Sequence, residues 1–266
     1  MNNQERQLKC YTIGHSNYPI GAFTYFLSVF RIDCIIDVRS SPYSKNNPQY
    51  NRKNLKTSLG KEGVEYRYYG DRLGGRYYAP DLLYPDGTVN YGKISQTSAF
   101  QEAIQGVIGL IEKGRVIALM CSEREPERCH RFALVSRNLQ QNNVNVIHII
   151  PGVKTQTNVE LEGGLKNKYL DKNQSTIDNT ASDDVETLYE IINKNIGFKV
   201  KTAYDVSNFK SKGGMSRIQT TQGLRDINTS IREENSNQES GRGNLPDEKF
   251  KVCEGKKNTK QKTLFN

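Results

Sequence analysis

The feature that most constrains the fold is a regular alternation of short strand-like runs with segments of helical periodicity, which extends from residue 10 to residue 150. The strand-like runs are 10–14, 33–38, 64–70, 115–121 and 144–150. The segments that place apolar residues three or four positions apart are 19–31, 51–63, 98–114 and 129–142. This order predicts an α/β fold, a three-layer sandwich with a mostly parallel sheet of roughly five strands.

The alternation stops after Pro151, where the sequence becomes richer in polar residues. Residues 183–197 could form one more helix, whereas the sequence from about 205 onward has no periodicity and little to bury. We therefore predict an α/β domain at 1–155, a linker with a possible helix at 156–204, and a disordered polar tail at 205–266.

Charge and cysteine content limit the partners and the compartment. The net charge of +9 favours anionic ligands, either a small molecule or a nucleic acid. No apolar run approaches the ~20 residues of a membrane span, and the N-terminus has no signal-peptide core. Five cysteines without regular spacing argue against a disulfide framework. We expect a cytoplasmic, reduced protein with no membrane partner, and the sequence leaves the oligomeric state open.

Polar residues gather where the predicted strands end, which is where ligands bind in an open parallel sheet. We predict that the catalytic residues are Cys121, Glu123, His15 and Asp37. We predict that the substrate-binding residues are Ser16, Asn17, Arg39, Gly74, Gly75, Arg76, His130 and Arg131. In this hypothesis the three arginines bind an anion, and the glycine pair lets the backbone approach it.

Cys121 has three competing interpretations. It is the last residue of a buried strand and precedes a helix with nearby arginines, a setting that can stabilise a thiolate, but it could equally be a buried core residue. A DVRS stretch followed later by a cysteine, a loop and a helix is an order similar to that of sulfurtransferases and cysteine phosphatases. The loop 122–128 is longer than the tight anion-binding loop of those enzymes, lacks glycine and contains Pro126. Alternatively, Cys121, Cys129 and His130, with His15 or His148, could bind zinc. Because no C-x-x-C pair is present, we assign no metal ligand and identify no cofactor.

Several motifs carry a resemblance to a known family. In chain order they are YTIGHSN, DVRSSPYSKNNPQYN, GVEY followed by LGGR, ALMCSEREPERCHR and VIHI. Together they resemble domain-of-unknown-function family 488 over about residues 10 to 150. The resemblance implies a compact α/β domain whose motif positions are Gly14, His15, Ser16, Asp37, Arg39, Pro42, Gly74, Gly75, Arg76, Cys121, Glu123, Cys129, His130, Arg131 and His148. It implies a site at the strand ends and leaves the reaction open.

Three functions compete at this stage. The first is an enzyme, a cysteine- or carboxylate-dependent hydrolase or transferase that acts on a nucleotide, nucleic acid or other phosphorylated compound. The second is a non-catalytic nucleic-acid-binding module, and the third is a zinc-stabilised interaction domain. Tyrosines surround the LGGR stretch and either stack on bases or cover the sheet edge: Tyr66, Tyr68, Tyr69, Tyr77, Tyr78 and Tyr84.

Overall fold

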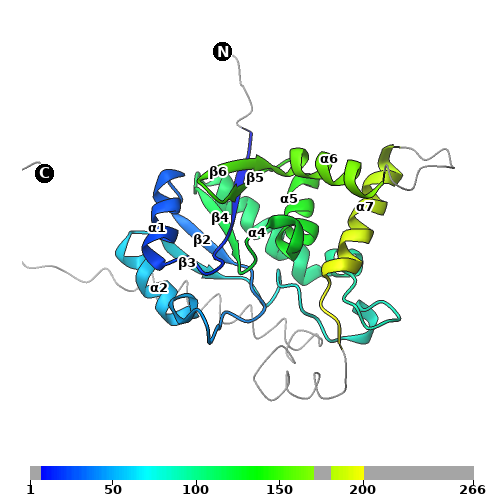
Figure 1. The fold of residues 1–266 in the computed structure, drawn as a ribbon, viewed down its shortest axis with the longest axis horizontal. Coiled ribbons are helices and arrows are strands. Elements are labelled where there is room, and N and C mark those ends of the chain that lie inside the picture. The colour runs from blue at the N-terminus through cyan, green and yellow to red at the C-terminus, as the bar shows by residue number, and fades with distance from the viewer. Residues whose placement is uncertain (1–6, 171–180, 201–266) are drawn as a thin grey trace, which may run out of the picture. The chain divides into compact units, whose positions relative to one another are not determined.

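The computed structural model describes residues 7–170 and 181–200, whose helices and strands are shown in Figure 1. The strands are β1 (Lys9–Gly14), β2 (Cys34–Asp37), β3 (Glu65–Tyr68), β4 (Ile117–Cys121), β5 (Asn145–Ile150) and β6 (Lys154–Thr157). They form one sheet in the order β3-β2-β4-β1-β5-β6. β1 to β5 pair in parallel, and β6 runs antiparallel to β5 at one edge. The predicted α/β class with a mostly parallel sheet is confirmed, with β6 as an additional strand.

Helices cover both faces of this sheet, as the predicted three-layer arrangement requires (Figure 1). They are α1 (Ile20–Val29), α2 (Arg52–Lys61), α3 (Tyr91–Ser95), α4 (Ser98–Glu112), α5 (Arg137–Gln141), α6 (Asn158–Tyr169) and α7 (Ala181–Ile196). A π-helical segment, Arg131–Ser136, leads directly into α5. Short 3-10 turns lie at Pro48–Tyr50, Pro80–Leu82 and Pro126–Arg128. None of the helices in the described ranges is long and apolar enough to cross a membrane.

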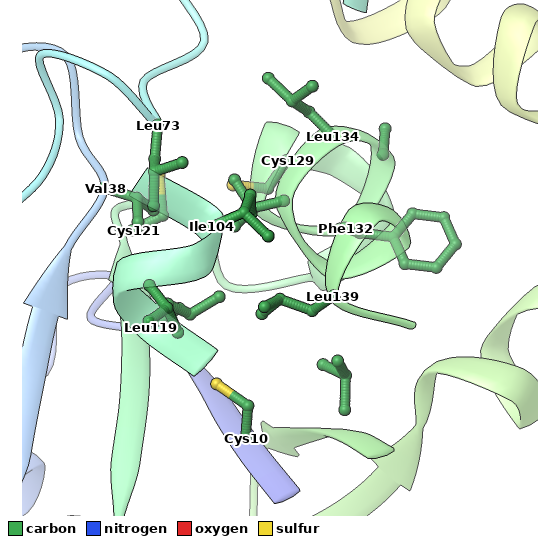
Figure 2. Packing of buried hydrophobic residues seen from close by; sticks show 14 of the residues in the cluster. Cys10, Val38, Leu73, Ile104, Leu119, Cys121, Cys129, Phe132, Leu134 and Leu139 are labelled. Carbon is green, nitrogen blue, oxygen red and sulfur yellow. The ribbon is translucent and has the colours of Figure 1, made fainter. Parts of the chain in front are cut away.

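β4 shows why the core has two halves. Successive side chains of a strand point to opposite faces of the sheet, so Leu119 and Cys121 enter one apolar cluster and Met120 enters the other. Met120 shares its cluster with Phe23 of α1 and the leucines of α2. On the other face, Figure 2 shows Leu119 and Cys121 packed near Ile104 of α4 and the segment that carries Phe132 and Leu139.

The segment that was predicted as a linker, 156–204, contains two helices. α6 begins with a capping box, in which Thr157 Oγ1 accepts a hydrogen bond from the Glu160 N–H at 3.2 Å and Glu160 Oε2 accepts one from the Thr157 N–H at 2.8 Å. α7, which the sequence placed at 183–197, buries Leu188 and Tyr189 in the main apolar cluster. The predicted tail, 205–266, lies outside the described residues.

The carboxyl ends of β1 and β4 are in unusually close contact. Parallel pairing continues past the strands, with the Ser16 N–H donating to the Ser122 carbonyl at 2.9 Å. A Cβ atom on Gly14 would lie 1.8 Å from the Glu123 carbonyl oxygen. Any side chain at this position would push the chain after β4 away, so Gly14 fixes where the loop 122–128 begins.

Candidate functional site

A cleft of about 210 Å³ lies where β2 and β4 end. Its walls come from segments that are far apart in the chain. They include Arg39 and Ser40 after β2, Gly75 and Arg76 after β3, Cys121 and Glu123 at the end of β4, Arg128, Cys129 and His130 before the π-helical segment, and Ile196 and Phe198 at and after the end of α7. The predicted convergence of polar residues at the carboxyl edge of the sheet is thus present for part of the predicted set.

Four of the lining residues form what we call the thiol cluster: Cys121, Glu123, Cys129 and His130. Both sulfurs lie within hydrogen-bond distance of Glu123 Oε2, Cys121 Sγ at 2.8 Å and Cys129 Sγ at 3.1 Å. His130 Nδ1 lies 3.8 Å from Cys121 Sγ and 3.7 Å from Cys129 Sγ. The two sulfurs and this nitrogen all lie within 4.8 Å of one another. Residues eight positions apart in the chain are therefore brought together by the loop 122–128.

The two thiols differ in acidity. Burial, and then the hydrogen bond with Cys129, raise the pKa of Cys121 well above its usual value. Burial also opposes ionisation of Cys129, but the hydrogen bond from Cys121 and the positive charges of Arg131 and His130 lower the pKa of Cys129 well below its usual value. Burial and the charge of Cys129 raise the pKa of Glu123. The sequence singled out Cys121 as the reactive thiol, whereas the structure places the more acidic thiol at Cys129.

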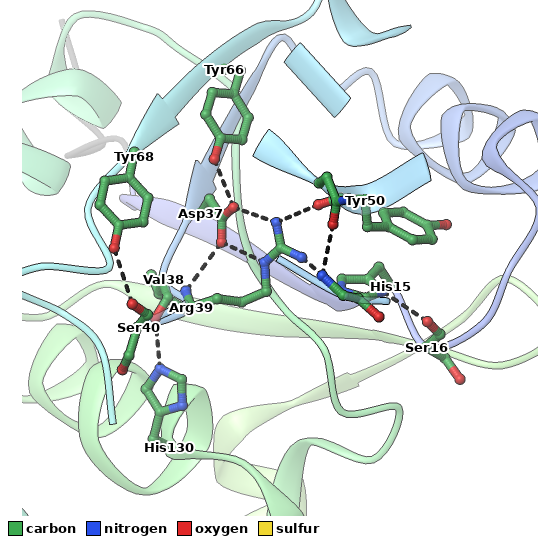
Figure 3. Close-up of polar contacts among 12 residues, drawn as sticks. His15, Ser16, Asp37, Val38, Arg39, Ser40, Tyr50, Tyr66, Tyr68 and His130 are labelled. Atoms are coloured by element: carbon green, nitrogen blue, oxygen red, sulfur yellow. Dashed lines mark hydrogen bonds and ion pairs between the residues drawn. The ribbon is translucent and has the colours of Figure 1, made fainter. Parts of the chain in front are cut away.

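His130 is held from two sides. Its Nε2 lies 2.9 Å from the Val38 carbonyl, which can only accept, so Nε2 carries the proton (Figure 3). Nδ1 therefore points toward the sulfurs. Burial alone would lower the pKa of His130, but the charge and hydrogen bond of Cys129 raise it overall. A Cβ atom on Gly75 would lie 2.8 Å from the imidazole Cγ, so the predicted glycine serves to admit the histidine ring.

Arg131 is fully buried behind the cleft and does not line it. Its Nη1 donates to the Glu123 carbonyl at 2.6 Å, and its Nη2 donates to the Arg124 carbonyl at 2.9 Å. Its backbone N–H donates to Cys129 Sγ at 3.4 Å. The residue predicted to bind substrate therefore shapes the loop that carries Glu123 and contributes positive charge near Cys129.

A second group of polar residues, the Asp37 network, adjoins the cleft, which its member Arg39 lines (Figure 3). It consists of Asp37, Arg39, His15, Tyr50 and Tyr66. Arg39 donates to both carboxylate oxygens of Asp37, from Nε at 2.9 Å and from Nη2 at 2.6 Å. Nη2 also donates to the Tyr50 carbonyl at 2.9 Å, and the Tyr66 hydroxyl donates to Asp37 Oδ2 at 2.7 Å. Asp37 is fully buried and Arg39 is 4% exposed.

His15 completes this network. Because a guanidinium can only donate, Arg39 Nη1 donates to His15 Nε2 at 3.0 Å, and His15 Nδ1 then donates to the Ser16 carbonyl at 2.8 Å. Burial and the charge of Arg39 lower the pKa of His15 to about 4, so the imidazole is neutral at physiological pH. Both ring nitrogens are occupied, as are both oxygens of Asp37. In this geometry the two predicted catalytic residues hold Arg39 in place.

The remaining predicted residues are divided between the cleft and its surroundings. Ser16 and Asn17 do not line the cleft and instead accept hydrogen bonds from Arg124, at 3.3 Å each. Gly74 is buried against Ser40, since a Cβ atom there would lie 2.3 Å from the Ser40 hydroxyl. Arg76 reaches the cleft, with its N–H donating to Ser40 Oγ at 3.1 Å and its guanidinium 5.3 Å from the Phe198 ring centre.

Two exposed arginines, Arg76 and Arg128, line the cleft without an ion pair to any described residue. Arg128 was not among the predicted site residues, although it is one of the arginines that follow Cys121 closely in the sequence. Cys129 was considered as a zinc ligand and not for catalysis. Its position next to His130 was a sequence signal for a functional cysteine. Its closeness to Cys121 could not be predicted, because it depends on how the loop between them folds.

The tyrosines and the third histidine serve the fold. The hydroxyls of Tyr66, Tyr68 and Tyr77 donate to Asp37 Oδ2, the Ser40 carbonyl and the Arg72 carbonyl. This arrangement favours the sheet-edge interpretation over base stacking. His148 lies between Thr12 and Asn158, and burial with the charge of Arg131 lowers the pKa of His148 to about 3.

Comparison with known proteins is informative at the level of the family. Residues 20–138 match the family described as "Domain of unknown function DUF488", which supports assigning this chain as DUF488-like and confirms the resemblance seen in the motifs. The match contains the whole thiol cluster together with Asp37, Arg39, Gly75 and Arg76. No curated protein and no solved structure matches the sequence.

Proposed function

We propose that this DUF488-like chain is an enzyme that acts on a small anionic substrate, such as a phosphorylated compound, in the cleft described above. Arg76 and Arg128 bind the anionic group, and the thiol cluster is the reactive centre. One observation carries the proposal: two guanidinium groups without ion-pair partners among the described residues border the same cleft as a cluster of thiol, carboxylate and imidazole groups.

The arginines suit an anion because of their charge and geometry. A guanidinium binds phosphate or carboxylate through paired, charge-assisted hydrogen bonds, and neither Arg76 nor Arg128 has such a partner among the described residues. Arg39 contributes less directly, since Asp37, His15 and the Tyr50 carbonyl occupy most of its N–H groups. Its network keeps the chain after β2 in place, including Ser40.

Cleft size favours a small ligand over a nucleic-acid strand. A cleft of about 210 Å³ is below the range of about 300 to 1,000 Å³ that is common for drug-sized ligands. It fits one compact anionic compound or the charged end of a larger one. The hydroxyls of Tyr66, Tyr68 and Tyr77 are bonded inside the protein, which weighs against a stacking surface for bases.

Glu123 is the candidate for proton transfer. It lines the cleft and lies within hydrogen-bond distance of both thiols. A carboxylate in this position can accept a proton from an attacking group or donate one to a leaving group. These groups support hydrolase or transferase chemistry.

Substrate binding is tested by calorimetric titration with inorganic phosphate and with nucleoside monophosphates. We expect Arg76→Gln and Arg128→Gln each to weaken binding about 10-fold or more. Lys113→Gln is the matched control. It removes the same charge from an exposed position between α4 and the start of β4, and the cleft lies where β4 ends. Equal weakening in all three variants would show a nonspecific charge effect. Oligonucleotides binding more tightly than every small anion would favour the nucleic-acid-binding alternative.

Catalysis is tested by following a panel of phosphomonoesters and nucleotides with phosphorus NMR. A substrate should be converted by the wild-type protein and about 100-fold or more slowly by Glu123→Gln. The Lys113→Gln variant should retain full activity. Unchanged turnover in Glu123→Gln would remove the carboxylate from the mechanism, and failure of every anion to bind or react would contradict the proposed function.

A further inference from the structure

We infer that the thiol cluster binds Zn²⁺, with Cys121 Sγ, Cys129 Sγ and His130 Nδ1 as ligands and a fourth coordination position that faces the cleft beside Glu123. This goes beyond the proposed function because it assigns a cofactor to the reactive centre.

The distances between the ligand atoms fit a tetrahedral ion. With Zn–S bonds of about 2.3 Å and Zn–N bonds of about 2.0–2.1 Å, neighbouring ligand atoms lie about 3.5 to 3.8 Å apart. His130 Nδ1 lies 3.8 Å from Cys121 Sγ and 3.7 Å from Cys129 Sγ, and the three atoms all lie within 4.8 Å of one another. No large rearrangement is needed for the three atoms to share one ion.

The direction of the imidazole supports the same conclusion. Nδ1 is almost equidistant from the two sulfurs, so it points between them and not at one of them. An ion located between the three atoms accounts for the symmetric position.

The residues around the cluster provide the support that metal ligands usually have. The His130 Nε2–H donates to the Val38 carbonyl, which leaves the Nδ1 lone pair available; a ligating histidine usually donates its other N–H in this way. The Arg131 N–H donates to Cys129 Sγ at 3.4 Å. Gly75 packs against the imidazole and limits its rotation. The ligands are therefore held in position by the fold itself.

The other histidines do not compete for this role. Both ring nitrogens of His15 are engaged, by Arg39 and by the Ser16 carbonyl. Those of His148 are engaged by Thr12 and Asn158. Of the ligand sets suggested by the sequence, only Cys121, Cys129 and His130 come together, and this group is the one potential metal-binding set found in the described ranges.

Glu123 marks the fourth position. Its Oε2 lies 2.8 Å and 3.1 Å from the two sulfurs and borders the cleft. Three protein ligands with a remaining position open to substrate or water are typical of catalytic zinc, and structural zinc usually has four protein ligands. If the proposed function holds, the ion would bind water in this position, and Glu123 would accept the proton that the water releases.

The experiment uses the full chain purified under reducing conditions and measures metal content by mass spectrometry. We expect about one zinc per chain, and Co²⁺ substitution should give the intense near-ultraviolet absorption of cobalt–thiolate bonds. Cys129→Ser and His130→Gln should each lower zinc affinity about 100-fold or more in a chelator competition. Cys10→Ala is the matched control, because this buried thiol lies at the start of β1, away from the cleft, and it should retain the metal.

Several outcomes would overturn the inference. One is Co²⁺ binding without thiolate absorption; another is equal affinity in Cys10→Ala and Cys129→Ser. A third is a Cys121–Cys129 disulfide in the reduced preparation together with no bound metal, which would indicate a redox pair. Circular dichroism of each variant separates loss of metal from loss of fold. Zinc binding without anion binding would leave the inference intact and reject the proposed function.

Discussion

The Asp37 network and the thiol cluster lie side by side at the carboxyl edge of the sheet, yet they are built differently. In the Asp37 network the carboxylate oxygens and the imidazole nitrogens all have partners at hydrogen-bond distance. In the thiol cluster the imidazole nitrogen stays 3.7 to 3.8 Å from both sulfurs, and all four side chains border the cleft.

This difference separates two roles for polar residues at strand ends. A buried group whose hydrogen-bonding capacity is already satisfied cannot bind a ligand without losing a bond, so its contribution is to position the backbone. A convergent group whose members contact mainly one another and border a cleft can exchange those contacts for bonds to a ligand. Location at the carboxyl edge therefore does not by itself identify a functional residue. The residue must also be able to form a bond to a ligand.

The largest expected effect comes from breaking the Asp37 network. Asp37→Asn leaves the Arg39 guanidinium buried without its counter-charge, and we expect a loss of about 3–5 kcal/mol in the free energy of unfolding. The free energy of unfolding is measured by urea denaturation monitored with circular dichroism. Tyr66→Phe is the control, since it removes one neutral donor to Asp37 and should cost about 1 kcal/mol. A smaller loss in Asp37→Asn than in Tyr66→Phe would show that the ion pair is not the main support of this edge.

The next effect is the dependence of stability on pH. Because the folded-state pKa of His15 is about 4, below its ordinary value, the unfolded chain binds more protons than the folded protein between about pH 6.5 and pH 4. The free energy of unfolding should therefore fall as the pH is lowered through this window, by roughly 1–2 kcal/mol at pH 5 for His15. His148, whose pKa is about 3, adds a loss of the same sign.

NMR titration of the three imidazoles measures this directly, with urea denaturation at pH 7 and pH 5 alongside. His15 and His148 should stay neutral at pH 5 in the folded protein. Titration of His15 near its ordinary pKa in the folded protein would mean that the bond from Arg39 does not hold the imidazole neutral.

A smaller effect is expected from Gly75→Ala, which changes the residue that packs against the His130 imidazole of the thiol cluster. The added methyl would lie 2.8 Å from His130 Cγ, so the ring must shift, and we expect zinc affinity to fall about 10-fold while the fold persists. Chelator competition measures the affinity. Gly163→Ala is the control, because nothing lies within 4 Å of a Cβ atom at this position in α6. Unchanged affinity in Gly75→Ala would show that the imidazole does not depend on this contact.

Much of the fold could be predicted because its core elements have strong apolar periodicity. The segment 98–114 predicted α4 nearly to its ends, with Phe100, Ile104 and Val107 on the buried face. β6 was missed because its sequence, KTQT, is polar and its pairing is decided by β5. α6 was missed because its apolar residues are too few to give a clear periodicity, and it depends on packing and on its capping box.

The site was harder to predict because it depends on contacts between distant segments. Topology indicated that Cys121, Glu123 and Arg76 would lie near the same edge. It could not show that Arg131 turns inward to bind the Glu123 and Arg124 carbonyls, or that Cys129 comes close to Cys121. Nor could it show that Arg39 donates hydrogen bonds to His15 and Asp37. Whether a side chain is free to bind a ligand depends on which neighbours it already bonds to in the fold.

The wall of the cleft formed by Ile196 and Phe198 comes from outside the segment that matches the family. The groups proposed for chemistry and the aromatic ring beneath Arg76 therefore belong to separate stretches of chain. Replacing the stretch around Phe198 would alter the shape of the cleft and leave the sulfur, carboxylate and imidazole groups in place. In evolutionary terms, substrate choice and reaction chemistry could diversify independently in a protein built this way.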